Sequence, residues 1–408
     1  MPDVSGAITR AHLEEWARVV ATLTRRFGDL DVAEQAAAEA FAVAVERWPH
    51  DGVPPSPGAW LTTTATRKAI DRIRRESKRD DRQREAQMLH GGDHDRRLGA
   101  IEDERLRLIF TCCHPALAME ARVALTLRMV GGLTVPEIAR AFLAQEPAIG
   151  QRITRAKAKI KSARVPYRVP SAEDLPFRVS GVLAVLFLIF NEGYLASGPD
   201  TDPVRKDLTA EAIRLTRLTH ALLPEDGEVA GLLALMLLTE ARRAARISAS
   251  GELVTLDEQD RGAWDAELVA EGHRLMRERL ETGAAPGPYQ LLAAINAVHT
   301  SEREFRDTDW SQIVALYDQL TRLDPSPIVA LNRAVAVAEL DGPEVALAAV
   351  DRLEDRLAGY HAYHATRADL LRRLGQSQQS RDAYDRAIQL AANTAEIAYL
   401  TRRRDQLG

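Results

Sequence analysis

Apolar residues recur every three to four positions along most of the chain, which is the spacing of amphipathic α-helices. Within residues 8–80 this pattern breaks twice, around Gly28 and around Pro54, and it therefore predicts three helices. Asp31 is placed to cap the second of these helices, and Ser56 is placed to cap the third. We expect this segment to fold as a small helical bundle.

The helical pattern stops at residues 81–100, which are polar, contain glycine and show no period, so a flexible linker is predicted there. The pattern then resumes, and Thr134 is placed to begin a short helix that is followed, after a break, by a second helix starting near Pro147. This layout is a helix-turn-helix, whose second helix enters the major groove of DNA. The predicted segments of the chain are 1–80, 81–100, 101–165, 166–200 and 201–408.

Residues 201–408 are predicted to form helical hairpins, and near the C-terminus their pattern repeats with an offset of 34 residues. The positions that correspond at this offset are Ala334 with Ala368, Val337 with Leu371, Leu340 with Leu374, Ala346 with Ser380, and Val350 with Tyr384. A helix-turn-helix period of this length is typical of tetratricopeptide (TPR) repeats, and a non-repetitive helical domain with a chance match is the alternative. The predicted fold class is all-α, with a helical bundle, a helix-turn-helix and a C-terminal TPR-like α-solenoid.

The net charge of −5 gives the whole chain no general attraction to nucleic acid, but its basic residues are concentrated in two segments. Residues 62–84 hold nine Lys and Arg against four acidic residues, and residues 147–168 hold seven basic residues and no acidic one. A helix with one cationic face attracts DNA phosphates through counterion release. For residues 62–84 a solvated amphipathic face is the alternative. For residues 147–168 the alternative is a basic helix end that complements its own dipole.

Other chemistry is sparse. The only cysteines, Cys112 and Cys113, are adjacent and poorly placed for a disulfide, which indicates a reducing, cytoplasmic setting. No Cys and His cluster with metal-ligand spacing and no phosphate-binding glycine loop is present, so we expect no metal, no cofactor and no enzymatic activity. Glu192, in the sequence Asn-Glu-Gly-Tyr, could bind a ligand, but the end of a helix is the preferred interpretation. The apolar run Val182–Phe190 is too short to span a bilayer and predicts a buried helix, with no membrane contact.

Three of these segments together resemble the sigma-70 family of RNA polymerase sigma factors, specifically its extracytoplasmic-function (ECF, group four) members. The resemblance covers about residues 8–164. The first segment, DLDVAEQAAAEAFAVAVERWP, is similar to region 2.1–2.2, which in the family contacts the clamp helices of the polymerase β′ subunit. The second, PGAWLTTTATRKAIDRIRRESKR, is similar to regions 2.3–2.4, which melt and read the −10 element. The third, LTVPEIARAFLAQEPAIGQRITRAKAKIK, is similar to region 4.2, which reads the −35 element.

The resemblance implies three sets of functional residues. Those expected to contact core polymerase, or to pack beneath the contact, are Asp31, Glu34, Gln35, Glu39 and Phe41. Those expected at the −10 element are Thr62, Arg67, Lys68, Asp71, Arg72, Arg74 and Arg75. Those expected at the −35 element are Gln151, Arg152, Thr154 and Arg155 on base edges, and Lys157 and Lys159 along the DNA backbone. The start of this last helix, Glu146-Pro147-Ala148, departs from the glycine-containing start usual in the family.

Two further stretches, DERLRLIFTCCHPAL and VPYRVPSAEDLPFRVSGVLAVLFLIFNEGYLAS, resemble a subgroup of these factors whose TPR-like extension stands in for a separate anti-sigma factor. The expected function is promoter-specific transcription initiation, regulated by the chain's own extension. The expected partners are core RNA polymerase (the β′ clamp and β subunits), promoter DNA, and a protein or peptide bound by the extension. The alternative is a helix-turn-helix regulator with a TPR-type sensor domain, which would act without core polymerase and would not need the acidic helix around Glu34.

Overall fold

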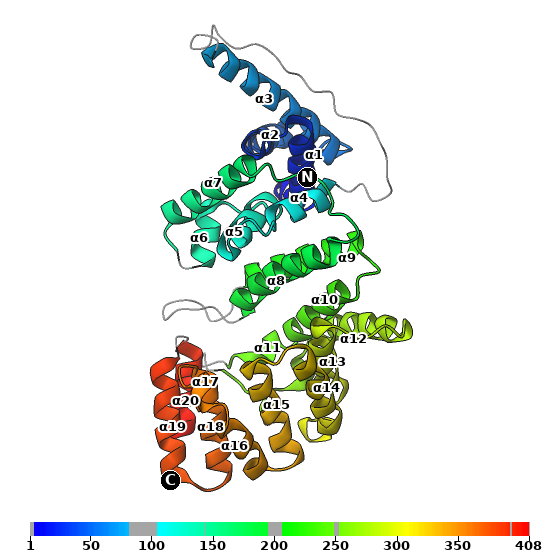
Figure 1. Ribbon diagram of the computed structural model, residues 1–408. Coiled ribbons are helices and arrows are strands. Elements are labelled where there is room, and N and C mark those ends of the chain that lie inside the picture. Colours follow the sequence, from blue (N-terminus) through cyan, green and yellow to red (C-terminus); the bar gives the residue numbers. More distant parts are fainter. Residues whose placement is uncertain are drawn as a thin grey trace. The chain divides into compact units, whose positions relative to one another are not determined.

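The computed structural model describes residues 4–80, 104–142, 144–194, 206–248, 253–391 and 394–407. The predicted linker at 81–100 lies outside the described residues. The chain forms two compact units, Met1–Leu188 and Ile189–Gly408. Among the described residues all regular structure is helical, apart from one isolated β-bridge between Ile247 and Leu253, which confirms the all-α prediction (Figure 1).

The N-terminal unit begins with the three predicted helices, α1 (Val4–Phe27), α2 (Leu30–Asp51) and α3 (Pro57–Asp80), which pack on one another. The cap of α2 is Asp29, whose carboxylate accepts hydrogen bonds from the backbone N–H groups of Asp31 (2.8 Å) and Val32 (3.3 Å). The prediction that Asp31 caps this helix was therefore wrong by two residues. Because the cap lies earlier, Asp31 belongs to the first turn, and its side chain is free to reach another helix.

Four shorter helices follow in the same unit: α4 (Glu104–Cys112), α5 (Met119–Met129), α6 (Val135–Ala141) and α7 (Glu146–Ser162). Thr134 and Glu137 form a reciprocal cap at the start of α6, since the Thr134 N–H donates to the Glu137 carboxylate (2.7 Å) and the Glu137 N–H donates to Thr134 Oγ1 (3.4 Å). Ile138 of α6 is fully buried, and Phe142, directly after the helix, is half-buried. Helices α6 and α7 pack on each other as the predicted helix-turn-helix.

Helix α8 (Leu175–Tyr194) contains the apolar run, and the division between the two units falls inside it. Its length and composition would allow it to cross a membrane, but buried core helices pass the same test, and Val182, Val185 and Ile189 are buried. Gly193, interpreted from the sequence as a helix cap, lies within the helix.

The C-terminal unit starts with α9 (Lys206–Leu222), α10 (Gly227–Glu240), α11 (Arg243–Arg246), α12 (Ala266–Glu281), α13 (Pro288–Ser301) and α14 (Trp310–Leu323). Every residue of α10 from Val229 to Glu240 is buried, because α9, α12 and α13 all pack against this helix. A helix that is apolar all round is expected only in such an enclosed position.

The remaining helices are α15 (Pro327–Leu340), α16 (Pro343–Asp351), α17 (Glu354–Leu357), α18 (His361–Arg373), α19 (Ser377–Leu390) and α20 (Thr394–Asp405). Figure 1 shows them side by side at the C-terminal end, in orange and red. Helices α15 and α18 begin 34 residues apart, as do α16 and α19, so the offset seen in the sequence is also the offset between hairpins. Leu340 is an exception to the shared core pattern, because it is 45% exposed. Membership of the TPR family remains a prediction.

Candidate nucleic-acid and polymerase interfaces

Helix α3 carries a cationic surface above an apolar one. Leu61, Ala65 and Ala69 are fully buried, and the basic residues lie on the other side of the helix. Of the residues predicted at the −10 element, Arg67, Asp71, Arg74 and Arg75 are exposed, and Thr62, Lys68 and Arg72 are half-buried. The Thr62 hydroxyl donates to the Gly58 carbonyl at 2.8 Å. Ile73 is 39% exposed although it is apolar, because the helix extends past the part that packs on its neighbours.

Helix α7 presents two polar faces. Gln151, Arg155 and Lys159 lie one helical turn apart and are all exposed, and Arg155 donates a hydrogen bond to the Gln151 side chain at 2.9 Å. With Arg152, which is half-buried, they line a groove of about 390 Å³ against the segment from Ala116 to Ala121 that leads into α5. Thr154 is exposed, but its hydroxyl donates to the Gly150 carbonyl of the same helix at 2.9 Å.

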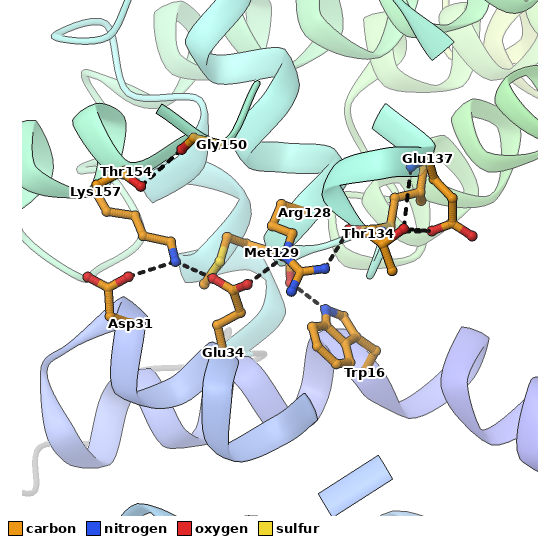
Figure 2. Close-up of polar contacts among 11 residues, drawn as sticks. Trp16, Asp31, Glu34, Arg128, Met129, Thr134, Glu137, Gly150, Thr154 and Lys157 are labelled. Carbon is orange, nitrogen blue, oxygen red and sulfur yellow. Dashed lines mark hydrogen bonds and ion pairs between the residues drawn. The ribbon is translucent and has the colours of Figure 1, made fainter. Parts of the chain in front are cut away.

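Lys157 does not share that exposed face, and its predicted role along the DNA backbone needs correction. The residue is only 8% exposed, and its ammonium group donates to the carboxylates of Asp31 (2.8 Å) and Glu34 on α2 (Figure 2). Lys161, one turn further along, pairs with Asp29 at 3.1 Å. Because 157 and 161 are offset from the row formed by 151, 155 and 159, both reach carboxylates at the start of α2, although only Lys157 is buried and Lys161 stays exposed.

The acidic residues in the first turns of α2, Asp31 and Glu34, are the partners of these basic side chains. Glu34, predicted to contact polymerase, is 8% exposed and accepts a second hydrogen bond, of 2.5 Å, from Arg128 of α5. Burial raises the pKa of Glu34, but the charges of Lys157 and Arg128 and their hydrogen bonds outweigh this effect and hold the pKa below its ordinary value of 4.5. Glu34 is therefore an ionised carboxylate enclosed by two cations.

The other predicted polymerase-contact residues lie in different settings. Asp31 keeps 63% of its side chain exposed even though it bonds Lys157. Gln35 is exposed, and Glu39 is partly exposed, 3.9 Å from Lys68 of α3. Phe41 is 7% exposed and packs on the rings of His12 and Trp16, so its role is to support the helix from beneath.

Additional contacts join the first three helices to the following four, and sequence reasoning did not identify them. The Trp16 indole N–H of α1 donates to the Met129 carbonyl of α5 at 3.2 Å (Figure 2). Arg128, which pairs with Glu34, is itself held by a bond within the second group, to the Leu133 carbonyl at 2.8 Å. The Tyr167 hydroxyl lies within hydrogen-bonding distance of the carbonyls of Ala21 (3.1 Å) and Glu104 (3.2 Å). The available signal was charge complementarity, since an acidic helix and an acid-free basic segment occur in one chain.

Neither the cysteines nor the described acidic and histidine residues form a metal site. Cys112 and Cys113 are buried free thiols, and burial raises the pKa of Cys113 to about 11. Within the described ranges no group of three or more His, Cys, Asp or Glu residues is placed to hold a metal ion.

The C-terminal unit contains a cavity of about 580 Å³, lined mainly by α14, α15, α18 and α20. Three arginines on its wall are paired with acidic residues: Arg373 with Glu339 at 2.6 Å, and both Arg372 (2.7 Å) and Arg403 (3.4 Å) with Asp369. The wall of the cavity also includes Asn332 and Val335, which are exposed, and the aromatic residues Tyr317, Tyr384 and Tyr399.

Comparison with known proteins gives matches along most of the chain. Residues 14–79 match the family model Sigma-70 region 2, and residues 107–160 match Sigma-70, region 4. Residues 178–280 match a family of unknown function (DUF6596). No solved structure gives a significant match.

Two curated relatives show how far the similarity extends. An uncharacterized protein of Rhizobium meliloti (strain 1021) is 43% identical over 99% of this chain and 96% of its own length. The probable ECF RNA polymerase sigma factor SigI of Mycobacterium tuberculosis is 29% identical over 42% of this chain and 59% of its own length. The two sigma-region matches contain α2, α3 and α7 with the surfaces described above. The chain therefore belongs to the sigma-70 family of RNA polymerase sigma factors, of the ECF type, and carries a long C-terminal extension.

Proposed function

We propose that this protein binds core RNA polymerase, directs it to a specific set of promoters, and is regulated by its own C-terminal extension. The observation that carries the proposal is the presence of two exposed cationic helices in one chain, α3 with Arg67, Arg74 and Arg75, and α7 with Gln151, Arg155 and Lys159. In this assignment α3 binds the −10 strand and α7 reads the −35 duplex. The protein acts in the cytoplasm as a binding protein without enzymatic activity of its own.

Each helix suits its assigned DNA element. Exposed arginines on α3 attract phosphates, and a single strand is held mainly through its backbone and its stacked bases. On α7 the side chains of Gln151 and Arg155 are of the types that form paired hydrogen bonds with adenine and guanine edges, while Lys159 suits a phosphate. Acidic α2 is assigned to core polymerase, because Asp31, Gln35 and Glu39 retain solvent exposure.

In vitro transcription tests the main assignment. The purified chain with core polymerase should start transcripts at defined promoters of a genomic template, and an absence of such transcripts would contradict the proposal.

The substitution Glu39→Lys separates the sigma-factor assignment from a regulator that acts without polymerase. It should weaken binding to core polymerase while binding of duplex DNA through α7 stays unchanged, and α7 is the readout because Glu39 lies 3.9 Å from Lys68 of α3. Glu34 is a poorer choice, because reversing a buried, doubly paired charge would also disturb folding.

The regulatory role of the extension is supported by the cavity lined by α14, α15, α18 and α20. Val335 on its wall is an exposed apolar residue, 43% accessible, in a setting where a partner segment would bury it. We expect Val335→Asp to change promoter output in cells without lowering the amount of folded protein. Val345→Asp is the matched control, since Val345 is also exposed, at 52%, but does not line the cavity. Equal output from both variants and the parent would contradict regulation through this cavity.

A further inference from the structure

We propose that the ion pairs between the start of α2 and the helices α5 and α7 form a latch that encloses part of the polymerase-binding side of α2, around Glu34, until core polymerase displaces it. The latch consists of Asp29, Asp31 and Glu34 on one side and Arg128, Lys157 and Lys161 on the other. The inference rests on the proposed assignment of α2 to core polymerase. It goes beyond that assignment by giving the free protein a closed state of its own.

The latch is fully complementary in charge. Each of its carboxylates faces at least one cation, and Glu34 faces two, Lys157 and Arg128. The cations come from residues 128–161 and the carboxylates from residues 29–34. Arg128 and Lys157 lie in the Sigma-70 region 4 match and Lys161 directly follows it, so the pairs join this part of the chain to the region 2 part. These bonds enclose Glu34, and a residue so enclosed cannot contact polymerase while they persist.

Closure affects the two proposed binding surfaces unequally. On α7 it occupies Lys157 and Lys161, while Gln151, Arg155 and Lys159 on the neighbouring face remain exposed. On α2 it removes Glu34 from the surface and engages Asp31. The closed chain therefore loses part of its proposed polymerase surface but keeps the proposed −35 reading face open. The latch controls polymerase recruitment more than it controls duplex recognition.

The make-up of the latch favours reversible opening. The Lys161–Asp29 and Lys157–Asp31 pairs are partly exposed to solvent, with side-chain exposures of 82% for Lys161 and 63% for Asp31. Salt weakens such exposed pairs. Only Glu34 and Lys157 are well buried. Separation would rehydrate all six charged groups, and polymerase would then offer α2 a new partner. When only a small fraction of a protein is open, its apparent affinity for a partner of the open state equals the intrinsic affinity multiplied by that open fraction.

Carbodiimide cross-linking tests the closed state in the full chain, because this reagent condenses a carboxylate and an amine that already touch into an amide and takes up the water as a urea. In the free protein, mass spectrometry should find Lys161 joined to Asp29, and Lys157 joined to Asp31 or Glu34. Lys159, exposed on the same helix and without a carboxylate contact among the described residues, is the internal control. Absence of these cross-links at low salt would overturn the proposal.

Binding of untreated protein to core polymerase is measured first, so that failure of the assignment itself is recognised separately. If binding occurs, adding saturating core polymerase before the reagent should abolish the cross-links, and protein cross-linked beforehand should no longer bind. Cross-links that form equally well in the holoenzyme, or cross-linked protein that binds normally, would overturn the latch while leaving the proposed function intact.

A substitution outside the proposed binding surfaces gives a second, independent test. Arg128→Gln removes one cation from Glu34 and should raise the apparent affinity for core polymerase, by up to about tenfold if nine-tenths of the molecules are closed. Arg122→Gln is the matched control, since Arg122 lies on the same helix, is also half-buried and also donates to backbone carbonyls, those of Leu117 and Pro115. Equal affinities for the two variants would contradict the proposal.

Discussion

Lys157 of α7 and Glu34 of α2 form an ion pair although they lie 123 positions apart, and their side chains are only 8% and 11% exposed. Each belongs to a helix with a separate proposed partner, DNA for α7 and core polymerase for α2. Their pairing means that the free chain satisfies with its own residues the charges that it would otherwise present to the transcription machinery.

Removing the carboxylate of this pair should be costly. In Glu34→Gln, Lys157 and Arg128 lose their shared anion while remaining largely buried, and breaking a buried pair on one side typically costs about 3 kcal/mol. We expect faster amide hydrogen exchange in peptides covering α2 and α7. The variant Lys161→Gln, which breaks an exposed pair, should change stability by less than about 1 kcal/mol. Equal exchange in the two variants would contradict the special role of Glu34.

Low pH should break the ion pairs that Glu34 makes with Lys157 and Arg128. The pKa of Glu34 is lower in the folded protein than its ordinary value of 4.5, so the folded state binds a proton less readily than the unfolded state. The stability that Glu34 contributes is therefore complete above pH 4.5 and is lost as the pH falls through the lower, folded pKa. Amide exchange of α2 peptides, followed from pH 6 downward and corrected for intrinsic exchange, should show this loss. Glu34→Gln should remove the dependence.

Gly132, in the turn between α5 and α6, should accept no side chain. Its φ of +78° is unfavourable for other residues, and an added Cβ would lie 2.7 Å from His12 and 3.0 Å from Trp16 of α1. We expect Gly132→Ala to lower the thermal stability of the protein and to speed exchange in α1. Gly28→Ala shares the strained φ, +68°, but has no neighbour within 4 Å, so it isolates the backbone cost. Equal effects from the two substitutions would exclude the steric contribution.

Two substitutions on the exposed face of α7 should affect DNA binding in different ways. Arg155→Ala should weaken binding to a selected promoter by about 1–3 kcal/mol and relax the preference at one base position. Lys159→Ala should weaken binding to all duplexes similarly and reduce the slope of log affinity against log salt by about one. Fluorescence anisotropy of the holoenzyme on labelled promoter duplexes measures both effects. A change in base preference caused by Lys159→Ala would contradict its assignment to a phosphate.

The C-terminal unit should lose stability in mild acid. Burial, together with the positive charges of Arg242 and Arg261, lowers the pKa of His299 from 6.5 to about 3. The unfolded chain therefore takes up a proton near pH 6.5 and the folded chain does not, so stability falls as the pH drops from about 6.5 toward 3. Melting temperatures of the full chain between pH 7 and pH 4 should show a smaller drop for His299→Gln than for the parent. The substitution His50→Gln, at an exposed histidine, is the control.

The helices were predictable from the sequence because their determinants are local. The breaks at Gly28 and near Pro54, the Thr134 cap and the 34-residue offset between α15 and α18 all follow from spacing along the chain. The cationic face of α3 and the exposed row on α7 could also be located, because periodicity alone separates a polar from an apolar side.

The environment of Lys157 could not be predicted in this way. Lys157 and Lys159 are both polar residues on one basic helix, and only the position of α2, more than a hundred residues earlier in the chain, makes one of them buried and leaves the other exposed. Likewise, the cap of α2 was predicted at Asp31, whereas it is Asp29, because the backbone path after Gly28 starts the helix two residues earlier.

The chain contains two cysteines in all, Cys112 and Cys113, and both are buried with raised pKa values. Peroxides and other oxidants attack the thiolate, which these residues form only in strongly alkaline solution. The two thiols of this factor are thus unreactive toward oxidants under cellular conditions, and a response to oxidative stress would have to use a route other than its cysteines.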